Sequence, residues 1–298
     1  MRRTPLVRLD IDAPAEIWLK LESLQPIGSF KLRGAASAIR QSDPSAWREG
    51  VWTTSAGNMA QGIAWMAREL GVKATVVAPD HAPAAKLDAI ARLGGETIRV
   101  PFDRWWEAME TGAYPGCSGL FVHPVLDERV IAGNGVIGLE LADDLPEADV
   151  VLVPWGGGGL STGIASALAG VGLKAKVFGV EPETGAPLTA SFAAGAPTTV
   201  DYRPSFVDGA GSKGLLPAMW ERARDLLAGG VAVTLAETAE AVRLLATRAH
   251  VVAEGAGGLA LAAALSGRVE GERIVCVVSG ANIDATRLAA ILSGSVPE

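Results

Sequence analysis

The sequence predicts an α/β protein built from two α/β units with a cleft between them. From residue 51 to residue 124, short apolar segments alternate with helix-forming segments, which is typical of a small parallel sheet with helices on its faces. Residues 149–154 predict a continuous apolar strand, as in a sheet buried on both faces. Four glycines and an alanine-rich helical segment follow that strand. Two α/β units are therefore the most economical architecture.

The first part of the chain alternates strands and helices. Residues 17–22 alternate as a half-buried strand does, and residues 35–40 favour a helix. The next strands are expected at residues 51–54, 73–79, 96–101 and 120–124. Helices are expected at residues 59–70 and 84–93, and a glycine follows the C-terminal end of each.

The second part begins with a returning helix at residues 130–142. Its strands are expected at residues 149–154, 176–180 and 273–278, and its helices at residues 160–168, 216–227, 239–250 and 256–265. Residues 181–214 are long and rich in proline and glycine, so we expect a functional surface loop there.

Composition excludes several classes of function. The 298 residues are 49% hydrophobic and 20% charged, which is enough apolar surface for a sizeable core. A net charge of -7 disfavours nucleic acid or an anionic membrane as the main partner. The two cysteines have no ligand spacing, and the sequence shows no signal peptide and no membrane-spanning segment. We expect a soluble cytoplasmic protein.

Lys31 lies between Phe30 and Leu32, just after a Pro/Gly turn. Between apolar neighbours a lysine can be desolvated, which favours the neutral amine and makes it a nucleophile toward an aldehyde. On spacing alone, a solvent-exposed ammonium is the commoner role, and both interpretations stay open.

The four glycines at residues 156–159 stand between a strand and a helix. Backbone N–H groups there can converge on a phosphate at the helix N-terminus, although a tight turn is the alternative. The segment has neither a dinucleotide fingerprint nor the Gly-Lys-Ser/Thr ending of a nucleotide-binding loop. A small cofactor phosphate is therefore favoured over ATP or NAD.

Two further junctions carry polar side chains. Residues 55–62 open a helix, where Ser55 or Asn58 could serve as a plain N-cap or the helix amides could bind a substrate carboxylate. Ser279 and Asn282 follow the last buried strand, at the end of the sheet where ligands bind in α/β folds. Taken alone, the second junction is better explained as a polar turn.

Together, four segments resemble the fold-type II pyridoxal-phosphate enzymes, in particular the threonine/serine dehydratase and serine racemase branch. They are GSFKLRGA around Lys31, SAGNMAQG at 55–62, GGGGL at 156–160 and SGANID at 279–284. The resemblance covers nearly the whole chain. It implies the tryptophan synthase β-like fold, two three-layer α/β/α domains with the active site in the cleft. The large cofactor-binding domain would comprise residues 1–47 and 129–298, and the small mobile substrate-side domain residues 48–128.

The resemblance also implies the role of each motif. Lys31, beside Phe30, would form the internal Schiff base with pyridoxal 5′-phosphate and later move the Cα proton. The other implied cofactor contacts are Gly156, Gly157, Gly158, Gly159 and Leu160 for the phosphate, Asn58 for the 3′ oxygen and Ser279 for the pyridine nitrogen. The implied substrate contacts are Ser55, Ala56 and Gly57 at the carboxylate, with Asn58, Asn134 and Gly209 nearby.

The implied reaction is β-elimination from a hydroxy amino acid, with L-threonine or L-serine first, giving a 2-keto acid and ammonia. A serine at the pyridine nitrogen leaves that nitrogen largely neutral, which suits elimination better than transamination. Alternative substrates are 3-hydroxyaspartate, for which Arg129 or Arg203 would supply a cation, and a hydroxyectoine-derived compound. Serine racemase or β-replacement activity ranks next. A non-catalytic ligand sensor is disfavoured, because a binder needs no Schiff-base lysine.

The chain departs from the family pattern at several positions near the expected pocket. Ala56 stands where the racemases carry a serine, which disfavours racemisation. Other departures are Met59, Asn134, Val136, Trp155 and the Glu254–Gly257 run. Glu181 matches one ligand of the racemases' metal site but Pro187 occupies the second position, so we predict no metal site and leave a cation requirement open. We also expect a homodimer and no C-terminal amino-acid-sensing domain.

Overall fold

The structure is a computed structural model in which residues 1–297 are described, and it contains two compact units. Unit 1 comprises Phe30–Asn134 together with Met1, and unit 2 comprises Arg2–Ser29 and the chain from Gly135 onward. The predicted small domain, residues 48–128, falls within unit 1. Its boundaries as a moving body stay a prediction.

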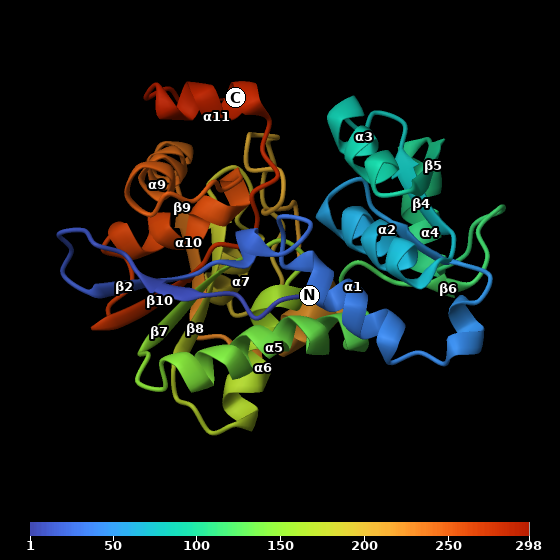
Figure 1. The fold of residues 1–298 in the computed structure, drawn as a ribbon. Helices are drawn as coiled ribbons and strands as arrows, with labels where there is room; N and C mark the ends of the chain where they lie inside the picture. Colours follow the sequence, from blue (N-terminus) through green and yellow to red (C-terminus); the bar gives the residue numbers. More distant parts are fainter. Residues whose placement is uncertain (298) are drawn as a thin grey trace. The chain divides into compact units, whose positions relative to one another are not determined.

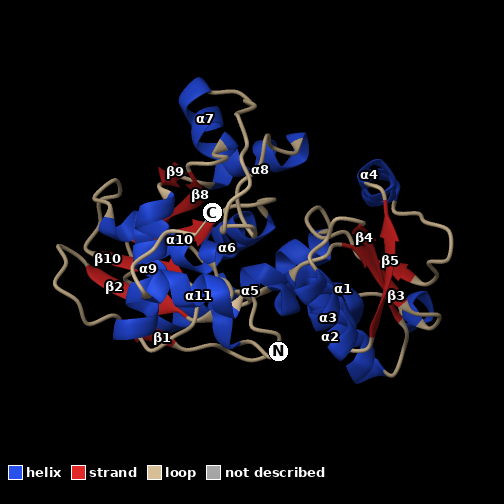
Figure 2. Cartoon of the chain, turned by 90° about the horizontal axis from the view of Figure 1, so that it is seen from above, coloured by secondary structure: helices blue, strands red, loops and turns tan. Residues whose placement is uncertain are grey.

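Unit 1 is a parallel sheet covered by helices. Its strands lie in the order β5 (Gly95–Val100), β4 (Ala74–Pro79), β3 (Val51–Thr54), β6 (Leu120–Phe121). The helices are α1 (Lys31–Arg40), α2 (Asn58–Leu70), α3 (Ala84–Arg92) and α4 (Phe102–Thr111), and Pro44–Trp47 forms a 3₁₀ turn. Figure 2 shows α2 and α3 on the same side of this sheet. Trp52, Val77, Val100 and Ala108 form the core between the sheet and α4.

Unit 2 is a six-stranded mixed sheet. Its order is β1 (Leu6–Arg8), β2 (Glu16–Lys20), β10 (Arg273–Val277), β7 (Val150–Pro154), β8 (Lys176–Pro182), β9 (Gly229–Val233). Only β1 runs antiparallel to its neighbour, and Glu22–Leu24 forms a 3₁₀ turn. The helices are α5 (Glu128–Asp144), whose residues up to Asn134 belong to unit 1, α6 (Gly159–Gly170), α7 (Pro187–Ala194), α8 (Pro217–Leu226), α9 (Leu235–Arg248), α10 (Gly255–Leu265) and α11 (Ala285–Leu292). In Figure 1, α5 and α6 lie on one side of this sheet and α9 and α10 on the other.

The α/β prediction is confirmed, and the structure corrects several elements. The helix expected to start at residue 35 starts at Lys31. The stretch 181–214, expected to be loop, contains α7. The strands β1 and β9 and the helices α4 and α11 were not predicted, and the predicted strand at 120–124 is only two residues long. The strands β1, β6 and β9 are only two to five residues long, which is too short for periodicity to identify them. Helix α4 is a ten-residue amphipathic helix, and its pattern was overlooked.

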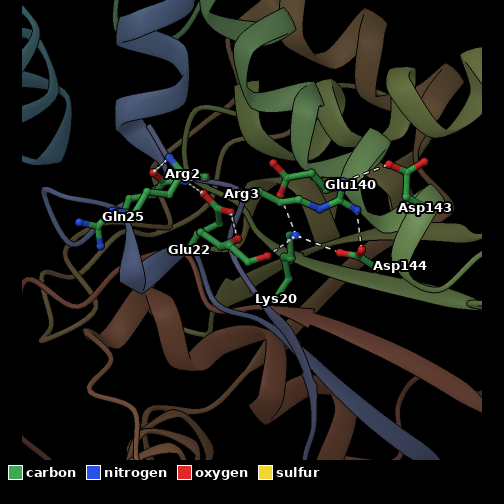
Figure 3. Close-up of polar contacts among 9 residues, drawn as sticks. Arg2, Arg3, Lys20, Glu22, Gln25, Glu140, Asp143 and Asp144 are labelled. Carbon is green, nitrogen blue, oxygen red and sulfur yellow. Dashed lines mark hydrogen bonds and ion pairs between the residues drawn. The ribbon is translucent and has the colours of Figure 1, made fainter.

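A buried ion-pair network joins the N-terminal segment of unit 2 to β2 and α5 (Figure 3). The ammonium of Lys20, which has no exposed side-chain surface, lies 2.7 Å from a carboxylate oxygen of Glu140 and donates to the carbonyl of Thr4 at 2.8 Å. Asp144 lies 3.5 Å from the same ammonium. The Thr4 hydroxyl donates to Glu22 at 2.5 Å. The start of unit 2 is therefore fixed by charge-assisted hydrogen bonds as well as by the sheet.

No helix among residues 1–297 is both long and apolar enough to cross a bilayer.

Candidate active site

Lys31 is the first residue of α1 and is half-buried. Its Nζ donates to the carbonyl of Pro124 at 3.3 Å and lies 5.1 Å from the ring centroid of Phe30. A Cβ at Gly62, on α2, would lie 3.3 Å from the carbonyl oxygen of Lys31, so α2 packs directly against the start of α1. The lysine thus has a defined position within unit 1 and is not a fully solvated surface side chain.

His123 lies beside this lysine, and the sequence did not mark it as a site residue. Its Nδ1 accepts hydrogen bonds from the backbone N–H groups of Val125 and Leu126, at 3.0 and 2.9 Å. Burial lowers the pKa of His123, Asp127 opposes that shift, and the positive charge of Lys31 lowers it further. The imidazole is therefore neutral at pH 7 and carries its proton on Nε2.

The N-terminus of α2 has no side-chain cap. Gly57 is the N-cap residue, and Asn58 is the first helical residue. The Ser55 hydroxyl accepts from the N–H of Gly57 at 3.2 Å and does not reach into the helix. The interpretation of Ser55 or Asn58 as a plain N-cap is therefore wrong. Ser55, Ala56 and Gly57 form a half-buried loop that leads into the positive end of the helix dipole.

Asn134 belongs to α5 and is buried against α1. Its side-chain oxygen would lie 3.1 Å from a Cβ at Gly34, one helical turn beyond Lys31. The structure therefore brings Lys31 and Asn134, two predicted site residues, to neighbouring parts of unit 1.

The glycine turn of unit 2 follows β7 directly. Gly158 is the N-cap residue of α6 with φ = 92°, in the left-handed region that favours glycine, and no side chain caps the helix. Cβ atoms at Gly156 and Gly158 would lie 3.1 Å from the carbonyl oxygen of Gly209 and 2.5 Å from the Trp155 ring. A helix whose N-cap residue is a glycine that cannot carry a side chain fits a phosphate cradle.

Trp155, the bulky departure before this turn, is a packing residue. Its side chain is fully buried, and its backbone N–H donates to the carbonyl of Val180 at 2.8 Å. The ring lies between Gly179 of β8 and Gly158, with Met219 on α8 also close to Gly158. The ring therefore packs against the glycine turn and holds it in place.

Gly209 and Ser279 lie in unit 2 as well. The carbonyl oxygen of Gly209 packs on Gly156, and the N–H of Gly211 donates to the carbonyl of Trp155 at 3.0 Å. Ser279 is 2% exposed and lies two residues after the end of β10, the strand that pairs with β7. The predicted phosphate turn, substrate loop and ring-nitrogen residue thus all lie at the carboxyl end of one sheet, where ligands bind in α/β folds.

Glu181 has a structural role at the start of α7. Its fully buried carboxylate accepts from the N–H groups of Leu188 and Thr189, each at 2.9 Å, and from the Thr189 hydroxyl at 2.9 Å. Pro187 is the first residue of α7, so the side chain six residues after Glu181 cannot supply an oxygen ligand. Among the residues that the structure describes, no group of three or more His, Cys, Asp or Glu side chains could hold a metal ion.

The two arginines considered for an acidic substrate lie outside these clusters. The guanidinium of Arg129 pairs with Asp127 at 2.6 Å and contacts the Ser42 hydroxyl, and this pairing raises the arginine's pKa. Arg203 is exposed in the segment between α7 and α8. Neither structural environment adds support for 3-hydroxyaspartate as substrate.

Comparison with known proteins agrees with this arrangement. A model of the family described as pyridoxal-phosphate dependent enzyme matches residues 1–280. The L-threonine ammonia-lyase of Thermotoga maritima is 40% identical over 286 residues, which are 93% of this chain and 70% of that protein. The catabolic L-threonine dehydratase of Staphylococcus aureus is 36% identical over 98% of this chain and 87% of its own length. The structure of maize serine racemase superimposes with a TM-score of 0.86 at 31% identity, over 98% of this chain and 92% of that one.

Proposed function

The chain belongs to the family of pyridoxal-phosphate dependent enzymes, and we propose that it is an ammonia-lyase that dehydrates and deaminates L-threonine, with L-serine as a second substrate. The observation that carries this proposal is the 40% identity to an L-threonine ammonia-lyase over 93% of the chain. The products are a 2-keto acid and ammonia.

The residues present fit the cofactor. The glycine N-cap of α6 and the absence of room for a side chain at Gly158 suit its phosphate. Lys31 would be the amine that binds the aldehyde carbon of pyridoxal phosphate, and Ser279 would meet its ring nitrogen. When bound, pyridoxal phosphate withdraws electrons from the substrate Cα, which makes the Cα proton acidic and the β-hydroxyl a leaving group.

The chain's own groups then bind the substrate and move its proton. The substrate carboxylate would bind at the positive end of α2, against Ser55, Ala56 and Gly57. Asn58 would orient the cofactor ring by contacting the 3′ oxygen of that ring. Lys31 takes the proton from Cα, and its contact with the Pro124 carbonyl keeps the Nζ in a fixed direction. Neutral His123 adds no positive charge beside this amine.

Racemisation is the second candidate, because the structure resembles a serine racemase at 31% identity. A racemase needs a proton donor on the face of Cα opposite the lysine. Position 56, where the racemases of this group carry a serine, is Ala56, and an alanine has no proton to donate. Elimination is therefore favoured.

The test is a comparison of substrates with the purified, cofactor-loaded protein. L-threonine, L-serine and threo-3-hydroxyaspartate are supplied separately, and 2-keto acid release and D-serine formation are both measured. We expect keto acid from L-threonine, less from L-serine, and no D-serine. D-serine without keto acid would favour the racemase instead.

We further propose that the protein is a cytoplasmic homodimer. Alanine-rich helices with few charges support an interface, and the free thiols Cys117 and Cys276 suit a reducing compartment. Light scattering of the purified protein tests the dimer, and fractionation of the producing cells tests the location.

A further inference from the structure

The turn that carries Ser279 is tied to the segment that leads to Lys31. In unit 2, the N–H of Ala281 donates to the carbonyl of Gly28 at 2.8 Å, and Asn282 Nδ2 donates to the carbonyl of Ile27 at 2.9 Å. Ser29 and Gly280 form an isolated antiparallel bridge. Whatever fixes residues 279–282 therefore also fixes residues 27–29.

Glu254 holds this turn from the opposite side. It is 7% exposed and directly precedes α10. Its backbone N–H donates to the carbonyl of Gly280 at 3.0 Å, and its Oε2 accepts from the N–H of Asn282 at 3.1 Å. A single residue thus engages two peptide groups of the turn, once through its backbone and once through its carboxylate.

The carboxylate of Glu254 does not cap its own helix. Glu254 occupies the N-cap position of α10, where a short polar side chain would ordinarily accept from the first turn of the helix, yet it makes no such bond. Burying a carboxylate is costly unless donors surround it, so its placement against Asn282 calls for a role outside the helix.

The residues around the contact between Glu254 and Asn282 are tightly packed. A Cβ at Gly257, in the first turn of α10, would lie 2.5 Å from the carbonyl oxygen of Gly280. A Cβ at Gly209 would lie 3.1 Å from the Ala256 Cβ and 3.6 Å from Glu254 Oε1. The first turn of α10 therefore packs against both the Ser279 turn and the predicted substrate loop.

We propose that Glu254 is a positioning residue for the cofactor ring. By accepting from Asn282, it sets the direction of the Ser279 hydroxyl and the path of residues 27–29 toward Lys31. The inference rests on the proposed function, in which Ser279 meets the pyridine nitrogen. This role requires a side-chain oxygen close enough to accept from the N–H of Asn282, and it does not require a negative charge.

Three substitutions separate the effect of the position of the side-chain oxygen at residue 254 from the effect of its charge. Glu254→Gln keeps an oxygen at the same distance and removes the charge. Glu254→Asp keeps the charge but withdraws the oxygen by one methylene, and Glu254→Leu removes both. As a matched control, Glu237→Leu removes another helix-start carboxylate of unit 2, which caps α9 through Thr234 and pairs with Arg268.

The experiment titrates each protein, stripped of cofactor, with pyridoxal 5′-phosphate and records the absorbance of the bound cofactor from pH 6 to pH 9. We expect Glu254→Asp and Glu254→Leu to bind the cofactor about tenfold more weakly and to shift its absorbance–pH profile. Glu254→Gln should follow the wild type. Glu237→Leu should lose thermal stability without a change of the profile.

An unchanged profile in Glu254→Asp and Glu254→Leu would overturn the proposal, and so would a Glu254→Gln profile shifted as far as that of Glu254→Asp. If Glu254→Leu does not fold, the Gln and Asp variants alone decide. Wild-type protein that binds no pyridoxal phosphate would refute the proposed function itself. Wild-type binding with unaffected variants would refute only the role of Glu254.

Discussion

The carboxylate of Glu181 accepts a hydrogen bond from the backbone N–H of Leu188 at 2.9 Å. This contact anchors the start of α7 to the end of β8, and the Leu188 side chain then packs on Gly179, beside Trp155. A chain of contacts inside unit 2 thus runs from Glu181 to the ring that supports the glycine turn.

Glu181 makes stability depend on pH. Burial raises its pKa from 4.5 to about 7, against the opposing effect of its hydrogen bonds from Thr189 and Leu188. Because the folded protein binds this proton more tightly than the unfolded chain, the contribution is full below about pH 4.5 and is lost as pH rises through about 7. The shift corresponds to about 3 kcal/mol.

Urea unfolding at pH 5 and pH 8 measures this effect. We expect the wild type to lose about 2.5 kcal/mol more than Glu181→Gln between these pH values, since the amide does not titrate. Glu183→Gln, two residues further along, serves as the control and should follow the wild type. Equal pH dependence in the wild type and Glu181→Gln would contradict the assignment.

The contact between Gly158 and Trp155 predicts a second result. Gly158→Ala places a methyl group 2.5 Å from the Trp155 ring, in addition to the strain of φ = 92°. Gly172→Ala is the matched control, because its φ is 78° and nothing lies within 4 Å of the added Cβ. We expect the control to lose roughly 1 kcal/mol of stability, and Gly158→Ala about 1–3 kcal/mol more, with weaker cofactor binding.

The double variant Gly158→Ala/Trp155→Val tests the cause. Removing the ring gives the added methyl group space, so part of the cofactor affinity lost in Gly158→Ala should return. Affinities of the single and double variants that do not differ would show that the ring is not the obstacle.

The Lys20 network predicts a third result. Lys20→Met removes the cation that faces the buried Glu140 carboxylate 2.7 Å away, and we expect a loss of about 3–5 kcal/mol in the free energy of unfolding. Arg104→Met breaks an ion pair with Glu107 in which both side chains are more than half exposed, so it should cost less than about 1 kcal/mol. Chemical denaturation of both variants measures the difference. Equal losses would mean that the buried network contributes no more than the surface pair.

The glycines at 156–159 stand out as a candidate site through the strand before them and the helix after them. The apolar neighbours of Lys31 left its role open, and only the family resemblance assigned it, so that role stays a prediction. The α/β order followed from the same periodicity, because strongly apolar strands such as β7 are recognisable without their partners.

The rest depends on contacts that sequence spacing does not encode. Glu254 and Asn282 are 28 residues apart and meet only because β10 and α10 are neighbours. The role of Glu181 required α7, which was hidden in a stretch rich in proline and glycine. The sequence also could not show whether Asn58 caps α2. That depends on the backbone conformation of Gly57, which is the N-cap residue.

The most direct test of the account is the release of 2-keto acid and ammonia from L-threonine by wild-type protein and Lys31→Ala, both supplied with pyridoxal 5′-phosphate. We predict equal amounts of the two products from the wild type and a rate lower by at least about a hundredfold in the variant, with thermal stability nearly unchanged. A variant as fast as the wild type, or a wild type that binds the cofactor but releases no keto acid from L-threonine, would contradict it.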